Sequence, residues 1–280
     1  MNKHLTMILG ERRYRVERPW GVLPPGMRFR GLSSVAVNAR GDVFAAQRRG
    51  HPIVVFDSSG RFMRAWGDEH LFDAHTMYIT DDDRMFVVDR DAHQVLQFNA
   101  EGVLVARLGT EHAPSFQAPF NHPTGVAVAR DGEIYVSDGY GNHCVHRFSP
   151  DGKLKQTWGR RGLGPGEFAI PHAVWVDRSD RVLVLDRDND RVQIFRRNGE
   201  YVGEWVGFHR PMTIVEDDRG MILISDLTPS LSMFTPDGVI VGRCRPVLLN
   251  IGHGICVGPS GDIYIAEMDS SHIVRLAPYE

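Results

Sequence analysis

One short pattern recurs six times along the chain, and it restricts the possible folds more than any other feature of the sequence. Each copy holds a turn, an alternating apolar run and, in all but the first, a closing acid; the copies occupy residues 41–45, 83–89, 132–138, 180–186, 220–226 and 261–267. Successive copies begin 40 to 49 residues apart. Alternating apolar runs repeated at this period are typical of β-propeller blades.

The residues around each copy supply the remaining strands of a blade. A short apolar run such as Val126–Val128 comes before each copy, and a third run ending in a large apolar residue comes after it. Asp-Gly or Asn-Gly turns then lead to a fourth run, as at Asp151-Gly152 and Asn198-Gly199, and such pairs favour tight hairpins. The sequence therefore predicts an all-β, six-bladed β-propeller that forms one domain over residues 1–280. A two-sheet sandwich gives no reason for six matching copies.

The last repeat ends at residues 277–280, before any fourth strand. Residues 12–18, near the N-terminus, lie outside the repeats and alternate like a strand. We expect this strand to pair with residues 272–276, complete the last blade and close the ring, because an open sheet edge is a liability.

Composition excludes several classes of protein. The formal net charge is −3 and no basic stripe is present, so no nucleic-acid partner is expected. No segment approaches the roughly 18 apolar residues of a membrane span, and the N-terminus lacks a signal cleavage site. The three cysteines, Cys144, Cys244 and Cys256, show no paired spacing. We therefore expect no disulfide framework, no membrane partner and a cytoplasmic location.

Histidine alternates in one column of the repeat. The residues just before the first strand of each blade are, in order, Ser33, His75, Thr124, His172, Met212 and His253. The innermost strands of a propeller begin beside its channel, so these three imidazoles should converge and bind a metal ion. Three nitrogen ligands with an open position suit catalytic Zn²⁺, although other divalent transition metals take the same ligands. Surface or loop roles are assigned to His51, His93, His112, His122, His143, His146, His209 and His272.

Two residues that follow a second strand should lie at the same end of the blades as this column. Tyr140, in Asp138-Gly139-Tyr140-Gly141-Asn142, could act as a general base or acid near a cation. Arg49, in Arg48-Arg49-Gly50, could hold a carboxylate. Either residue could equally serve solubility or packing.

The repeats resemble those of NHL-type propellers, most clearly over residues 186–195. More narrowly, the chain is similar to the peptidyl-α-hydroxyglycine α-amidating lyase family across all six blades. Residues 121–128, residues 134–140 and Pro171-His172 carry this second resemblance.

The resemblance implies a zinc-dependent carbon–nitrogen lyase. In that family three channel histidines hold Zn²⁺, and they correspond here to His75, His172 and His253. The catalytic tyrosine corresponds to Tyr140 and the catalytic arginine to Arg49, with Arg48 as the alternative in register. The family reaction cleaves an α-hydroxyglycine into an amide and glyoxylate. The implied substrate is a small molecule with a hydroxyl group and a carboxylate or amide.

The chain departs from the family at three positions, and at one of them Ile251 replaces a methionine near the metal. Gly254 stands where an acid contacts a structural Ca²⁺, which argues against that calcium site, and Gly141 replaces a cysteine beside the catalytic tyrosine. Two other functions remain open. One is a lactonase-like metal-dependent hydrolase on the same propeller, and the other is a non-enzymatic NHL scaffold that binds a protein.

Overall fold

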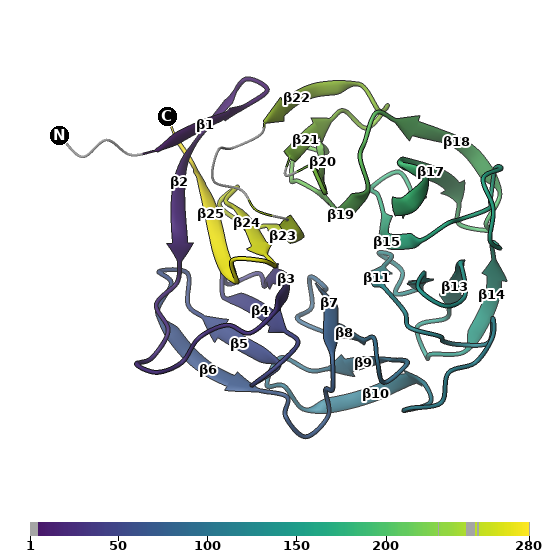
Figure 1. Cartoon of the computed structure of the whole chain (residues 1–280), viewed down its shortest axis with the longest axis horizontal. Coiled ribbons are helices and arrows are strands. Elements are labelled where there is room, and N and C mark those ends of the chain that lie inside the picture. The colour runs from purple at the N-terminus through teal and green to yellow at the C-terminus, as the bar shows by residue number, and fades with distance from the viewer. Residues whose placement is uncertain (1–4, 229, 245–249, 251, 280) are drawn as a thin grey trace. The chain divides into compact units, whose positions relative to one another are not determined.

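The computed structural model describes residues 5–228, 230–244, 250 and 252–279. Within these ranges every regular element is a β-strand except η1, a 3₁₀ turn at Arg187–Asn189. The strands form six antiparallel sheets, which are the blades of a six-bladed β-propeller (Figure 1). The predicted fold class is confirmed. No helix in the described part of the chain has the length and apolar character needed to cross a bilayer.

Contacts divide the chain into two compact units, and the second unit, Gly67–Met212, holds three complete blades. Blade 2 contains β7 (Ala74–Ile79), β8 (Met85–Asp89), β9 (Gln94–Phe98) and β10 (Leu104–Gly109). Blade 3 contains β11 (Gly125–Val128), β12 (Ile134–Asp138), β13 (Cys144–Phe148) and β14 (Leu154–Trp158). Blade 4 contains β15 (Pro171–Val176), β16 (Arg181–Asp186), β17 (Arg191–Arg196) and β18 (Tyr201–Val206).

The first unit, Met1–Trp66 with Thr213–Glu280, holds blades 1, 5 and 6, and the division between the units falls inside β19. Blade 1 contains β3 (Leu32–Val37), β4 (Val43–Gln47), β5 (Ile53–Phe56) and β6 (Phe62–Trp66). Blade 5 contains β19 (Pro211–Glu216), β20 (Ile222–Asp226), β21 (Ser230–Phe234) and β22 (Ile240–Cys244). Blade 6 contains β23 (Gly252–Val257), β24 (Ile263–Glu267), β25 (His272–Pro278), β2 (Arg12–Trp20) and β1 (Thr6–Leu9). That residues 1–280 form a single domain stays a prediction.

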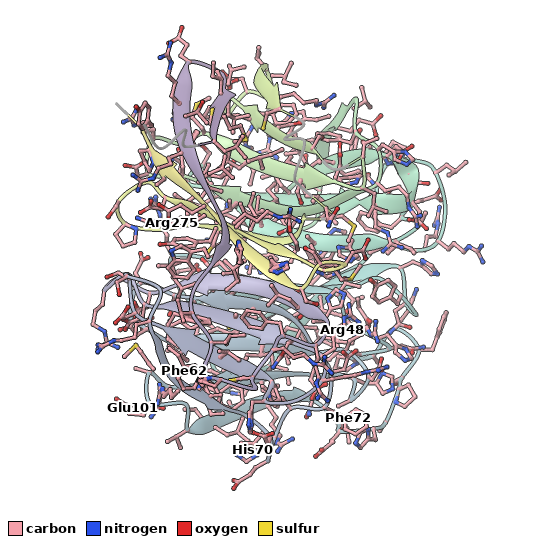
Figure 2. All side chains as sticks on the ribbon, turned by 60° about the vertical axis from the view of Figure 1, so that its left-hand side comes forward. Arg48, Phe62, His70, Phe72, Glu101 and Arg275 are labelled. Atoms are coloured by element: carbon pink, nitrogen blue, oxygen red, sulfur yellow. The ribbon has the colours of Figure 1, made fainter. Side chains whose placement is uncertain are left out.

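The N-terminal strand completes the last blade, as the alternation of residues 12–18 predicts. Strand β2 pairs with β25, with Val16 opposite Leu276 and Glu17 opposite Arg275. Arg275 reinforces the pairing, because its guanidinium lies 3.2 Å from Glu17 and 3.0 Å from Asp262 (Figure 2). The structure adds strand β1, which pairs with β2 and makes this sheet five-stranded.

The second strand of each blade carries the core. Every residue of β12 is buried, because alternate side chains enter different apolar clusters. Val136 packs in a cluster with Phe86 of blade 2, whereas Tyr135 packs in a cluster with Phe195 of blade 4. The outermost strands, such as β18, alternate between half-buried and exposed residues. A strand covered on both faces needs no polar alternation, which explains the apolar runs in the repeat.

Candidate metal and catalytic site

The three histidines of the repeat column hold the same position in three blades. Each is the second residue of its blade's first strand and stands at a register shift, where the pairing with the second strand skips one residue. A bulge of this kind re-aims the extra side chain. His75 is fully buried, and His172 and His253 are 1% and 5% exposed. The backbone bulge therefore places each of the three histidine side chains in a buried position.

One contact recurs at all three histidines. The Nδ1 atom of His75 lies 2.8 Å from the carbonyl oxygen of Thr124, that of His172 lies 2.8 Å from Met212, and that of His253 lies 2.7 Å from Ser33. A carbonyl oxygen only accepts, so each Nδ1 carries the proton and donates it. The lone pair of each neutral ring is then on Nε2. This backbone anchor is the outer contact that zinc-binding histidines usually make, so the donor set fits a divalent transition metal.

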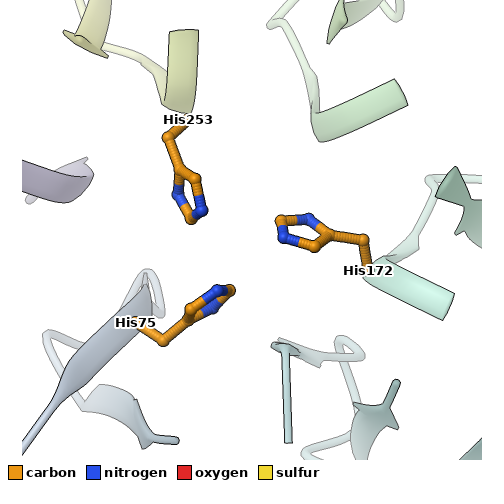
Figure 3. A group of neighbouring side chains, drawn as sticks. All are labelled: His75, His172 and His253. Atoms are coloured by element: carbon orange, nitrogen blue, oxygen red, sulfur yellow. The ribbon is translucent and has the colours of Figure 1, made fainter. Parts of the chain in front are cut away.

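The second unit brings His75 and His172 together with Tyr140. The two histidines offer nitrogen atoms within 4.8 Å of each other, and Figure 3 shows both rings. The Tyr140 hydroxyl lies 3.3 Å from Nε2 of His75 and 3.0 Å from Nε2 of His172. His253, which Figure 3 also draws, lies at the start of β23 in the first unit. His75, His172 and Tyr140, three of the residues predicted for the site, therefore lie close together in the second unit.

Two glycines hold Tyr140 in place. A Cβ atom on Gly139 would lie 2.3 Å from the carbonyl oxygen of Pro171, and one on Gly141 would lie 2.3 Å from the side chain of Asn121. Neither position has room for a side chain. The backbone of this loop consequently packs directly against its neighbours, which restricts the position of Tyr140.

Two arginines beside Tyr140 were missed by the analysis of the sequence. A guanidinium nitrogen of Arg187 lies 3.4 Å from the Tyr140 hydroxyl, and its carbon Cζ lies 5.5 Å from the ring centroid. The corresponding carbon of Arg90 lies 5.8 Å from that centroid. Burial works against the charge of Arg90, but its ion pairs with Asp91 and Asp73 raise its pKa above the ordinary value. The repeat contained a signal that could have identified both arginines, because each directly follows the acid that ends the second strand of its blade.

Arg48 and Arg49 lie just after β4 in the first unit. The backbone nitrogen of Arg48 donates to the carbonyl oxygen of Gly31, and that of Arg49 donates to Arg30. The Arg49 side chain is exposed, and the Arg48 side chain, labelled in Figure 2, is half-buried. Their assignment to the catalytic site stays a prediction.

A second group of metal-ligand side chains lies inside blade 3 and consists of Asp138, Cys144 and His146, all buried. The surface or loop role expected for His146 is therefore wrong. His146 is fully buried on β13, where bonds to Asp138 and to Thr157 make its burial tolerable. His93 is buried at 6% exposure but lies in the turn before β9, so the loop role expected for it holds. Burial raises the pKa of the Cys144 thiol.

Comparison with known proteins places the chain in a family. A model described as "NHL repeat" matches residues 120–148. NHL repeat-containing protein 3 of Homo sapiens is 31% identical over 290 aligned positions, which cover 94% of this chain and 78% of that protein. The chain belongs to the NHL repeat family. All the residues of the second ligand group lie within the matched repeat.

Other similarities of this NHL-repeat protein are more distant. The probable peptidyl-alpha-hydroxyglycine alpha-amidating lyase of Caenorhabditis elegans is 28% identical over 298 aligned positions, which cover 91% of this chain and 85% of that protein. Among solved structures, a streptogramin B lyase superposes with a TM-score of 0.71 at 13% identity and covers 95% of this chain and 98% of its own. At that identity the match shows the fold alone.

Proposed function

We propose that this NHL-repeat protein is a metal-dependent lyase that cleaves the C–N bond of a small α-hydroxyglycine-like compound. His75, His172 and His253 bind one divalent transition metal ion in this proposal, with zinc preferred by three imidazole ligands. The observation that carries the proposal is the repeated design of the three histidines, each on a bulge and each anchored through Nδ1 to a backbone carbonyl. The similarity to a probable amidating lyase supports the reaction class.

A bound divalent ion would supply Lewis acidity to the hydroxyl oxygen of the substrate. The protein's own residues handle the proton. Tyr140, whose oxygen lies within 3.3 Å of two Nε2 atoms, takes the proton from the substrate hydroxyl. The O–H electron pair becomes the C=O bond of glyoxylate, the C–N pair passes to the amide nitrogen, and that nitrogen receives a proton. The substrate hydroxyl loses one proton and the amide nitrogen gains one, so the reaction needs no other reactant.

Arginines assist the reaction at two points. Arg187 donates toward the Tyr140 oxygen and fixes its direction. Arg49, with Arg48 as the alternative, binds the substrate carboxylate or stabilises developing charge. The Arg49 role rests on the family resemblance, whereas the Arg187 contact is present in the structure.

Release of glyoxylate from simple α-hydroxyglycine derivatives, with and without a chelator, tests the proposal. Tyr140→Phe keeps the ring and removes the hydroxyl, so turnover should fall by roughly 10² to 10⁴, the usual value of one general acid or base. Metal content and melting temperature should stay within error of the parent protein. Full activity in Tyr140→Phe would remove the tyrosine from the mechanism.

Lactone hydrolysis and metal content, measured beside glyoxylate release, separate the rival functions. A metal-loaded protein that cleaves no carbinolamide but hydrolyses lactones would be a hydrolase. A protein that binds no metal at the histidines would be a scaffold. Either result would overturn the lyase proposal.

A further inference from the structure

The closing acid of the repeat has an unusual set of partners in blade 3. The acid and the third-strand residue opposite it are Asp89 and Gln94 in blade 2, Asp186 and Arg191 in blade 4, Asp226 and Ser230 in blade 5, and Glu267 and His272 in blade 6. All four partners can donate a hydrogen bond, and Arg191 also neutralises its acid at 2.9 Å. In blade 3 the residue opposite Asp138 is Cys144, and His146 follows two positions later. Blade 3 therefore surrounds its acid with metal-ligand side chains.

Both distances from His146 to the other two side chains are close to those of a zinc site, and all three ligand atoms lie within 4.8 Å of one another. Nε2 of His146 lies 3.1 Å from a carboxylate oxygen of Asp138 and 3.5 Å from Sγ of Cys144. Around tetrahedral zinc with ordinary bond lengths, a nitrogen and an oxygen ligand lie about 3.3 Å apart, and a nitrogen and a sulfur ligand about 3.5 Å apart. The group needs little rearrangement to accept an ion.

The surroundings of the group also resemble those of a metal site. Nδ1 of His146 lies 2.8 Å from the Thr157 hydroxyl, so the second ring nitrogen is held. The Asp138 carboxylate accepts bonds from the backbone nitrogen of Asn121 at 3.0 Å and from the side-chain amide of Asn142 at 2.6 Å. Outer contacts of this type orient histidine and carboxylate ligands.

Asn142 provides an independent observation. The residue is 1% exposed, and its Oδ1 atom is buried without a hydrogen-bond partner. Its amide nitrogen donates to both Asp138 and the carbonyl oxygen of Ser115, which fixes the orientation of the amide group. A buried oxygen left without a donor is destabilising, and such atoms often lie beside a bound ion or water.

We propose that Asp138, Cys144 and His146 form a second metal site, for a divalent thiophilic ion of the zinc class, inside blade 3. Thiolate, imidazole and carboxylate together favour zinc over magnesium or calcium. The ion supplies the positive charge that Arg191 provides in blade 4. Asp138 lies two residues before Tyr140, so the ion also braces the loop that presents the tyrosine. The site does not depend on the proposed lyase activity.

Cobalt substitution of the full-length protein tests the site. The protein is stripped with a chelator under reducing conditions and loaded with Co²⁺, and its absorption spectrum is recorded. A thiolate-to-cobalt charge-transfer band should appear and saturate within two equivalents of added Co²⁺, because the three repeat-column histidines also bind the ion. Cys144→Ser should abolish the band, whereas Cys256→Ser, a change to a thiol on β23, should leave it unchanged. If Cys144→Ser fails to fold, the presence or absence of the charge-transfer band in the parent protein decides whether the site exists.

The His75→Ala/His172→Ala double variant separates this proposal from the lyase proposal. It should lose the metal bound at those histidines and keep the charge-transfer band at full intensity. No band in the parent protein would overturn the second site and would leave Asp138 and His146 as a hydrogen-bonded pair only. A band that disappears in the double variant would also overturn it.

Discussion

The two proposed groups of ligand side chains in this protein are assembled in opposite ways. His75, His172 and His253 come from three different blades and are each anchored by a backbone carbonyl from another blade. Asp138, Cys144 and His146 come from two adjacent strands of one blade and are anchored mainly by side chains. The first group depends on the repeat, which places one histidine in each of three blades. The second group depends on hydrogen bonds between neighbouring side chains of one blade.

This difference has consequences for stability and function. A histidine at the start of a blade's first strand can change without disturbing the second strands that form the core. The blade 3 group lies among fully buried residues, where an unmatched carboxylate has no water to compensate it. Loss of a repeat-column histidine should therefore impair metal binding, and loss of His146 should impair folding.

The largest expected effect is on stability. His146→Ala should lower the free energy of unfolding of the metal-free protein by about 3 kcal/mol, because it leaves a cavity in the core and removes one hydrogen bond of the buried Asp138 carboxylate. His172→Ala should lower it by about 1 kcal/mol, the net value of one hydrogen bond. Urea denaturation in the presence of a chelator measures both. Equal losses of unfolding free energy in the two variants would show that the two groups do not differ in their contribution to stability.

The next effect concerns the arginines around Tyr140. Arg187→Ala should reduce turnover by roughly tenfold to a hundredfold, since a hydrogen bond involving a charged group is worth about 1.5–3 kcal/mol. Arg49→Ala should also lower activity, and Arg48→Ala should lower it much less. Glyoxylate release by each purified variant gives the comparison. A larger loss for Arg48→Ala than for Arg49→Ala would reverse the assignment in register.

The repeat made the histidine group accessible from sequence, because equivalent positions in six copies could be compared. Tyr140 was found through the same alignment, and so were the pairing of β2 with β25 and the fold class. Arg187 and Arg90 were missed although each follows the acid that ends a second strand, because only the side-chain packing shows their contact with Tyr140. His146 was missed for a different reason. Its column in the repeat is not shared by other histidines, and only the side-chain packing within blade 3 shows that it faces Asp138.

The smallest expected effects come from two threonines, each in contact with a histidine Nδ1 atom. Thr76 lies 3.0 Å from Nδ1 of His75, but the carbonyl oxygen of Thr124 also accepts from that atom at 2.8 Å. Thr76→Val should therefore weaken metal binding at the repeat-column histidines by about threefold at most, within the net value of one neutral hydrogen bond. Thr157→Val removes the hydroxyl that holds His146 and should weaken cobalt binding at the blade 3 group by roughly tenfold. Competition with a metal indicator measures both affinities, and the thiolate band separates the two sites. Equal sensitivity to the two changes would mean that the backbone anchor contributes nothing beyond what a side chain provides.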